Sequence, residues 1–348
     1  MTVLPTRWVR RVVVAPLVVV LLVLLLTSAP VWLLLAAAAS PLLPGRWRPL
    51  RLLWFLLLYA AMELVCLVVL FGLWVATGFG WSLRAPWSQR AHYALVRRFL
   101  RVLEWEARRV LGVRVEVEGP APAEYHERPL IVLARHAGPG DSFLVVNALM
   151  NSYAREPRIV LKDTLQWDPA IDVLLNRLPN GFITPDPGRT GHLVEEQISR
   201  LAHDLDGNDS LVIFPEGGNF TAARRQRAID RLRQRGLERM ARRAEQMMHV
   251  IAPRPGGVTA ALGSAKDADV VLVAHTGLEH LSSVIDLWRG LPMDTVVRMR
   301  WWQVPAAEVP RDDDAVVEWL FGWWGLVDAW IARNRPPDPL RDESSATT

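Results

Sequence analysis

Two long apolar segments near the amino terminus limit what this chain can fold into more than any other feature. Residues 12–39 carry no charged side chain, and residues 52–79 carry only Glu63. Each segment is long enough to cross a hydrocarbon core of roughly 30 Å. A basic start, an apolar run and the small residues of LAAAAS are also typical of a signal peptide. The length of the first segment and the second one close behind it favour membrane helices that are retained.

The basic residues around these segments fit either a spanning pair of helices or a shallow re-entrant hairpin that turns near Thr27–Pro30. Arginines precede the first segment, separate the two segments and follow the second. In either case the remaining chain lies on the same side of the membrane as the amino terminus. We expect that side to be cytoplasmic and the membrane to be the inner (plasma) membrane. Glu63 is costly when it faces lipid, so we expect it to face a partner helix or the interface.

The remainder of the chain has the mixed composition of a folded globular domain. Cys66 is the single cysteine, which excludes an intrachain disulfide and a Cys/His metal cluster and fits a reducing compartment. Nearly all basic residues are arginines, since Lys162 and Lys266 are the only lysines. Arginine binds phosphate in a planar, two-pronged geometry, although the codons of a GC-rich genome produce the same bias.

Short β-branched runs alternate with helical stretches from residue 83 onward. Residues 83–112 predict a basic amphipathic helix that suits a membrane surface. Seven strand-like runs follow: RVEVEG, PLIVLARH, RIVLKD, GFIT, SLVIFPEG, ADVVLVAHTG and TVVRMRWWQVP. This alternation predicts an α/β fold with a mixed β-sheet flanked by helices, preceded by an N-terminal membrane helix pair. We expect membrane-anchoring helices over residues 1–82, the α/β domain over 83–335 and a disordered tail over 336–348.

Two polar turns follow apolar strands within the α/β domain. His136 ends the run PLIVLARH, and Asp141 follows after a Gly-Pro-Gly bend. Alone, this pair is more commonly a turn histidine and an N-cap aspartate than a base with its orienting carboxylate. LVIFPEGGNFT, residues 211–221, is a second strand that ends abruptly and then presents Glu216 and two glycines. Few kinds of protein combine two such turns with a membrane anchor, so the two turns together indicate function more strongly than either one alone.

Together the two turns resemble the first and third motif blocks of the glycerolipid acyltransferases, the 1-acyl-sn-glycerol-3-phosphate acyltransferase family. His136 and Asp141 match a His-four-residues-Asp block, and residues 214–217 match Phe-Pro-Glu-Gly. NGFIT at 180–184 and HVIAPRPGG at 249–257 are similar to the second and fourth blocks. The resemblance extends over residues 95–335, so the domain at 83–335 is expected to be an acyltransferase domain.

The resemblance implies a membrane-bound O-acyltransferase that moves a fatty acyl group to the hydroxyl of a lysophospholipid. The leading acceptor is 1-acyl-sn-glycerol-3-phosphate, which gives phosphatidic acid, and acyl-CoA or acyl-ACP (acyl carrier protein) is the co-substrate. No cofactor and no metal are implied. His136 would take the hydroxyl proton, and Asp141 would fix the tautomer and stabilise the imidazolium. Glu216 and Gly217 would bind the acceptor, and Gly218 would let the main chain approach it.

Three departures from the family pattern leave the acceptor open. Arg135 stands where the family often has Asn, Gly218–Asn219 where it often has Thr-Arg, and Thr184 or Pro185 where the second block ends in arginine. Phosphate recognition must then come from other basic residues. The substrate-binding candidates are Arg135, Lys162, Arg177, Arg189, Arg225 and Arg254.

Several alternatives fit the same residues. The acceptor could be another lysophospholipid or a phosphate-free lipid alcohol, water could replace it in a hydrolase, or the fold could serve as a catalytically silent membrane scaffold. The basic segment 224–248 is either a solvated helix or an interfacial helix facing anionic lipid. Membrane lipids and the acyl donor are the expected partners. Nucleic acid is not, because no aromatic residues interleave with the charge.

Overall fold

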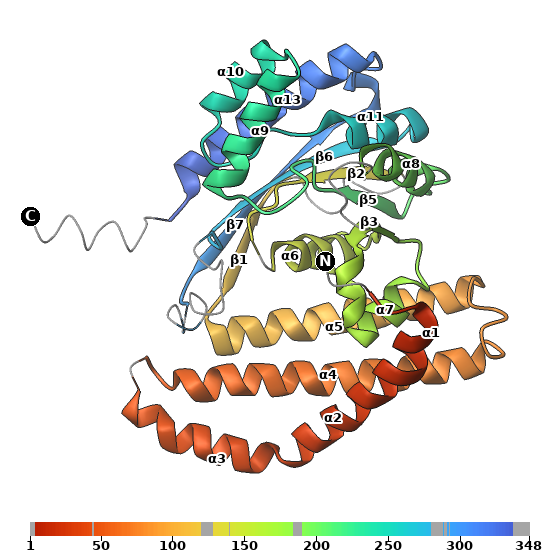
Figure 1. The fold of residues 1–348 in the computed structure, drawn as a ribbon, viewed down its shortest axis with the longest axis vertical. Coiled ribbons are helices and arrows are strands. Elements are labelled where there is room, and N and C mark those ends of the chain that lie inside the picture. The colour runs from red at the N-terminus through yellow and green to blue at the C-terminus, as the bar shows by residue number, and fades with distance from the viewer. Residues whose placement is uncertain are drawn as a thin grey trace, which may run out of the picture. The chain divides into compact units, whose positions relative to one another are not determined.

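A computed structural model of the chain describes most of its residues (Figure 1). The described residues are 4–43, 45–119, 128–138, 140–183, 190–279, 288, 291 and 293–336. They fall into two compact units. The first comprises Met1–Val113, Arg158–Gln197 and Leu291–Asp294, and the second comprises Arg114–Pro157, Ile198–Gly290 and Thr295–Thr348. The boundary predicted between residues 82 and 83 stays a prediction, because compactness alone does not define an independently folding domain. All but the first residue of the predicted tail lies outside the described residues.

The first unit is mostly helical. Its helices are α1 (Arg7–Val9), α2 (Ala15–Thr27), α3 (Ala29–Ala39), α4 (Arg48–Ala76), α5 (Pro86–Glu106) and α7 (Pro169–Leu175), with π-helical turns at Arg10–Val14 and Ala107–Leu111 and 3₁₀ turns at Ser40–Leu42 and Asp163–Trp167. β3 (Glu156–Lys162) pairs in parallel with β4 (Gly181–Ile183), and α8 (Thr190–Ala202) follows. The helix predicted over residues 83–112 is confirmed as α5 and the π-helical turn after it.

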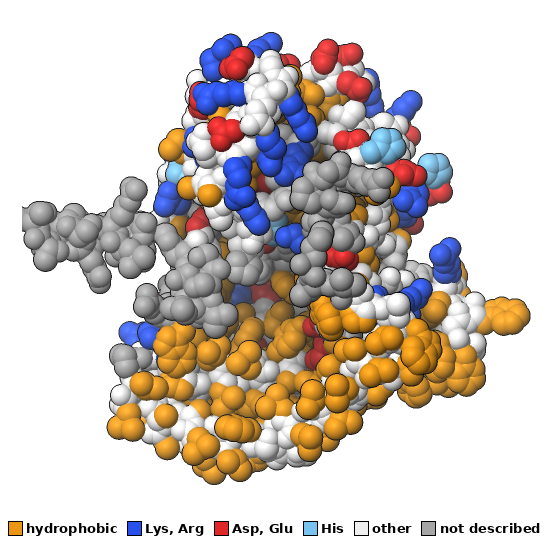
Figure 2. Space-filling view, viewed as in Figure 1, with side chains coloured by type: hydrophobic (Ala, Val, Ile, Leu, Met, Phe, Trp, Pro, Cys, Tyr) orange, Lys and Arg blue, Asp and Glu red, His pale blue; other side chains and the backbone are white. Residues whose placement is uncertain are grey.

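The first apolar segment forms two helices with a break between them. Pro30 lacks an amide hydrogen and its ring clashes with the carbonyl of the preceding turn, so the helix does not continue unbroken through Ser28. Ser28 Oγ donates to the carbonyl oxygen of Leu24 at 2.8 Å. α2 and α3 both pack against α4, and hydrophobic side chains cover their outer faces (Figure 2). By length and composition, Arg7–Thr27 and Arg48–Ala76 are the two described helices that could cross a membrane.

Glu63 is the one charged residue of the second apolar segment, and it is buried in the first unit. Its Oε1 accepts a hydrogen bond from the Ala170 amide at 3.0 Å, at the amino-terminal end of α7. The helix dipole favours negative charge at that end. One turn earlier on α4, the Tyr59 hydroxyl donates to Asp168, the N-cap of α7, at 2.8 Å. Glu63 therefore faces protein, and its partner is α7.

The second unit is built on a mixed sheet with the strand order β1-β7-β6-β2-β5. The strands are β1 (Arg114–Glu118), β2 (Leu130–Ala134), β5 (Asp209–Ile213), β6 (Asp269–Thr276) and β7 (Val296–Val304). β2 runs parallel to β5 and β6, β7 runs antiparallel to β6, and β1 runs parallel to β7. With β3 and β4, each of the seven predicted strands is present where the sequence places it. The mixed α/β fold is confirmed.

The central strands of this sheet form the core of the second unit. Every residue of β2, β5 and β6 is buried, and strands buried on both faces have long apolar runs in their sequences. The helices are α6 (Asp141–Asn147), α9 (Ala222–Gln234), α10 (Glu238–Gln246), α11 (Pro255–Ser264) and α13 (Asp313–Asn334), with a π-helical turn at Ala148–Ser152 and a 3₁₀ turn at Ala306–Glu308. α9, α10 and α13 lie together on one side of the sheet, and α6 lies on the other (Figure 1). Because β2 and β5 are paired in parallel, their carboxyl ends are adjacent, and both polar turns emerge there.

Candidate active site

His136 lies just beyond the carboxyl end of β2 and contacts the turn that follows β5. Its ring packs against the ring of Phe214 with a centroid separation of 4.8 Å. Its carbonyl oxygen accepts a hydrogen bond from the Phe220 amide at 2.8 Å. The two motif blocks, 78 positions apart between His136 and Phe214 (214 − 136), are therefore joined at one edge of the sheet.

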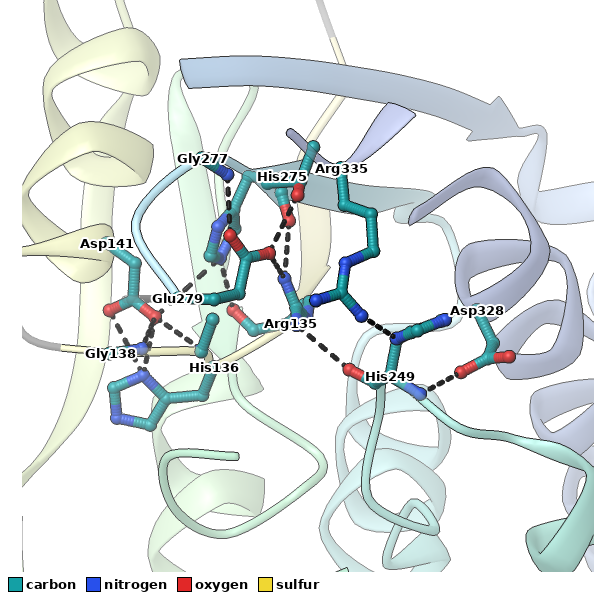
Figure 3. A network of polar contacts seen from close by, with 12 residues as sticks. Arg135, His136, Gly138, Asp141, His249, His275, Gly277, Glu279, Asp328 and Arg335 are labelled. Atoms are coloured by element: carbon teal, nitrogen blue, oxygen red, sulfur yellow. Dashed lines mark hydrogen bonds and ion pairs between the residues drawn. The ribbon is translucent and has the colours of Figure 1, made fainter. Parts of the chain in front are cut away.

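Asp141 is the first residue of α6, and its carboxylate points back at His136 (Figure 3). His136 Nδ1 lies 3.0 Å from Oδ2 and 3.1 Å from Oδ1. Oδ2 also accepts from the amides of Ala137 at 2.7 Å and Gly138 at 3.1 Å. Oδ1 accepts from the Ser142 amide at 2.6 Å. The residue that caps α6 is Gly140, so the Asp141 side chain organises the His136 turn instead of serving as the N-cap.

These contacts fix the charge of Asp141 and the tautomer of His136. Burial alone would raise the pKa of Asp141, but the hydrogen bonds from His136 and the backbone outweigh it and leave this pKa below its usual range. A carboxylate accepts only, so His136 Nδ1 carries the hydrogen and Nε2 keeps its lone pair. The His136 side chain is 19% exposed while that of Asp141 is 1% exposed. The arrangement is that of a reachable base held by a buried acceptor.

A second layer of buried polar groups lies behind this pair (Figure 3). His275 Nε2 donates to the Arg135 carbonyl oxygen at 3.0 Å and lies 3.6 Å from Asp141 Oδ2. Burial holds the pKa of His275 below its ordinary value, so its ring is neutral. The Arg135 guanidinium donates to Glu279 at 2.7 Å and to the carbonyl oxygens of His275 and His249 at 2.7 and 2.9 Å. Arg135, predicted to bind substrate, is 1% exposed, and its hydrogen bond to His275 joins the end of β2 to β6 inside the protein.

Glu279 completes this layer. Its carboxylate also accepts from the Thr276 hydroxyl and the Gly277 amide, each at 2.7 Å. Burial opposes ionisation, but Arg135 and these donors lower the pKa of Glu279 to about 2. Neither Glu279 nor this role of His275 was predicted from the sequence. The sequence feature that could have revealed them is the polar end of the run ADVVLVAHTGLE. This run contains β6, which pairs with β2, so its polar end lies beside the His136 turn.

Glu216 lies in a tight turn after β5, and the two positions that follow it favour glycine. Gly217 has φ +69° and Gly218 has φ +157°, a range that L side chains rarely adopt. Glu216 is 2% exposed, and its Oε2 accepts from the Ile251 amide at 3.3 Å. Its Oε1 has no hydrogen-bond partner among the described residues. Burial raises the pKa of Glu216 to about 8, although the Arg135 charge and the Ile251 amide act in the opposite sense.

This raised pKa predicts a stability that falls with pH. Between the unfolded and folded pKa values, the folded protein holds a proton on Glu216 that the unfolded chain has released, so higher pH favours unfolding. The slope is up to about 1.4 kcal/mol per pH unit within that window, from about pH 4.5 to 8. Glu216→Gln, which mimics the protonated acid, removes this dependence. Denaturant unfolding of both proteins at pH 5, 7 and 9 measures it, and parallel profiles would contradict the prediction.

A pocket of about 220 Å³ opens beside the Glu216 turn. It is lined by Glu216, Gly217, Gly218, Arg224, Arg227, Arg231, Ile251 and Arg254. Of the predicted phosphate-binding residues, Arg254 lines this pocket. Arg225 does not, because its guanidinium donates to the carbonyl oxygens of Met247 at 2.5 Å and Glu245 at 2.7 Å and so ties α9 to the end of α10. Arg224, Arg227 and Arg231 also line the pocket, although none of them was among the predicted substrate-binding residues.

The other predicted phosphate-binding residues are not among the residues that line this pocket. Lys162 is exposed at the end of β3 in the first unit. Arg177, also in the first unit, donates to the Leu70 carbonyl oxygen at 2.8 Å and lies 3.2 Å from His92 Nε2. Arg189 lies outside the described residues. Within the described part of the chain, no group of three or more His, Cys, Asp or Glu side chains could hold a metal ion.

Part of the chain matches a known protein family. The family model described as Acyltransferase matches residues 114–255, which include His136, Asp141, Glu216 and Arg254. Among solved structures, the crystal structure of the 1-acyl-sn-glycerophosphate (LPA) acyltransferase PlsC from Thermotoga maritima is similar, with a TM-score of 0.45 and 14% sequence identity. The similarity covers 72% of this chain and 83% of that chain. A comparison with curated proteins gave no match.

Proposed function

We propose that this chain, which belongs to the acyltransferase family, acylates the hydroxyl group of a lysophospholipid at the membrane. The family resemblance predicted from the sequence is confirmed by the match of residues 114–255 to the Acyltransferase family model. Acyl-CoA or acyl-ACP supplies the acyl group. The leading acceptor is 1-acyl-sn-glycerol-3-phosphate, and phosphatidic acid is then the product.

The contact between His136 Nδ1 and the Asp141 carboxylate carries this proposal. In the neutral ring it puts the hydrogen on Nδ1 and leaves the Nε2 lone pair free on a partly exposed side chain, and it places a buried negative charge against the ring when the ring becomes protonated. Three backbone amides hold the carboxylate in place, so the pair is rigid before any substrate arrives. A positioned base of this kind contributes about 10²–10⁴-fold to a rate.

The proposed reaction is a direct transfer. His136 Nε2 takes the proton of the acceptor hydroxyl as its oxygen attacks the thioester carbonyl. The tetrahedral intermediate collapses by breaking the carbon–sulfur bond, and the imidazolium returns the proton to the leaving thiolate. An ester and a free thiol are formed, and His136 ends neutral. The acceptor hydroxyl occupies the role that a serine has in a serine hydrolase, so neither an acyl-enzyme nor a cofactor is required.

Membrane attachment is a further part of the proposal. Arg7–Thr27 and Arg48–Ala76 are long and apolar enough to hold the protein in a bilayer. A bilayer is also where a lysophospholipid and its diacyl product partition. We assign the protein to the inner membrane with residues from 83 onward in the cytoplasm, where acyl-CoA and acyl-ACP are made.

Mass spectrometry of lipid products tests the proposal directly. Purified protein in detergent is incubated with lysophosphatidate, lysophosphatidylglycerol, lysophosphatidylethanolamine and monoacylglycerol together with one labelled acyl-CoA or acyl-ACP. We expect labelled phosphatidic acid to form fastest, and the His136→Ala protein to form almost none. Labelled product from another acceptor alone would move the proposal to that acceptor. No labelled lipid with either donor would refute acyl transfer to a lysophospholipid.

A further inference from the structure

Four arginines line the pocket beside Glu216, and three of them lie outside the four motif blocks of the sequence. Arg224, Arg227 and Arg231 are spaced by three and four residues on α9, so they share one face of the helix. Arg254 joins them from the segment before α11. Basic side chains gather over α9 on the face of the molecule drawn in Figure 2.

The guanidinium groups of these four arginines differ in their charge partners from those of their neighbours on α9 and α10. None of the four forms an ion pair with another described residue, whereas their neighbours Arg233, Arg239 and Arg243 pair with Glu245 or Glu318. The surrounding protein and the positive charges of Arg231, Arg235 and Arg224 lower the pKa of Arg254. Like charges held this close repel one another, and a bound anion removes that repulsion.

The two glycines beside Glu216 let the guanidinium groups of Arg254 and Arg224 lie close to the backbone of the turn. A Cβ on Gly217 would lie 2.9 Å from the Arg254 guanidinium, and one on Gly218 would lie 2.9 Å from that of Arg224. Glu216, more than nine-tenths buried, lines the pocket with an Oε1 that has no partner. In its protonated form this carboxyl donates a hydrogen bond to an anion instead of repelling it. The first amides of α9 are at the same end of the helix as Arg224, where the helix dipole also favours an anion.

We infer that the pocket of Arg224, Arg227, Arg231, Arg254 and Glu216 binds a phosphomonoester dianion. It thereby takes the place of the arginines that are missing from the second and third motif blocks. The inference rests on the proposed function for its substrate. Two substrates carry this chemistry, namely the head group of lysophosphatidate and the 3′-phosphate of CoA. The head group is favoured, because the turn that carries Glu216 also carries Phe214, which packs against His136.

Substitution of two pocket arginines tests the inference through substrate selectivity. In Arg227→Ala/Arg231→Ala we expect the KM for lysophosphatidate to rise by at least about 10–100-fold, which is the effect of losing one charge-assisted hydrogen bond. The preference for lysophosphatidate over monoacylglycerol, as a ratio of kcat/KM values, falls by the same factor. Arg231→Lys keeps the charge but loses the two-pronged geometry, so its effect is intermediate. Arg242→Ala is the matched control, because Arg242 is exposed on α10 and does not line the pocket.

A binding measurement separates this inference from the proposed function. Inorganic phosphate is expected to raise the Tm of the wild-type protein and of Arg242→Ala, but not that of the double variant. A rise in the KM for lysophosphatidate assigns the pocket to the acceptor, and a rise only in the KM for acyl-CoA assigns it to the donor. If the protein acylates no lysolipid but phosphate still stabilises it through these arginines, the proposed function is wrong, while the assignment of the pocket as a phosphate site is supported. Equal stabilisation of wild type and double variant, with both KM values unchanged, would overturn the inference.

Discussion

His136→Ala is expected to lower kcat for acyl transfer by about 10²–10⁴-fold or more. The variant removes the atom that accepts the hydroxyl proton, while the turn that holds it keeps its remaining contacts. Oδ2 of Asp141 still accepts from the amides of Ala137 and Gly138. The fold therefore survives, and the loss appears in turnover. Initial rates with one labelled acyl donor, at saturating lysophosphatidate, measure it.

His203 offers a matched control for this experiment. It also contacts an aspartate, with Nδ1 2.8 Å from Asp204 Oδ2, but both side chains are largely exposed. His203→Ala is expected to leave the rate within a factor of two of wild type, because an exposed pair of this kind contributes little. A purified, folded His136→Ala protein that acylates lysophosphatidate at a near-normal rate would show that His136 is not the base.

The sheet could be predicted because its strands carry their own signal. β2, β5 and β6 are buried along their whole length, so each is a largely apolar run that ends at a polar turn. The closeness of His136 to the Phe-Pro-Glu-Gly turn follows from parallel pairing of β2 with β5, since carboxyl ends of parallel strands meet at one edge. Local pattern and one topological rule therefore bring the two turns together, and the family resemblance is what identified His136 as the candidate base.

The roles of the arginines could not be predicted in the same way. Arg135 is adjacent to His136 in sequence, but successive residues in extended chain point to opposite sides, and Arg135 turns into the protein toward Glu279. Arg225 likewise neighbours Arg224 on α9 but faces the end of α10. Which arginines meet in a pocket depends on the turn at Gly217, and helical spacing does not reveal that turn. The break of the first apolar segment, in contrast, lies where one of the two alternatives left open by the sequence had placed a turn, near Pro30.

Asp141→Asn is expected to lower kcat by about 10²–10⁴-fold and also to destabilise the fold. An asparagine that keeps its oxygen at Oδ2 puts its NH₂ group against the Ser142 amide, and the reverse orientation puts it against the amides of Ala137 and Gly138. Each buried donor left without an acceptor costs about 1–3 kcal/mol. The substitution also removes the negative charge that stabilises the His136 imidazolium, as in the corresponding serine-protease variant, whose kcat falls by about 10⁴.

The two effects of this substitution can be separated, and the separation decides what Asp141 does. The rate is measured per folded molecule, well below the Tm that the variant shows in a thermal melt. If Asp141 only holds the turn together, kcat under those conditions matches wild type, and the carboxylate has no part in catalysis. If it stabilises the imidazolium, kcat stays low however stable the preparation is. Asp230→Asn controls for loss of one carboxylate, because Asp230 accepts from Gln226 at 3.0 Å on the exposed face of α9 and should change neither quantity.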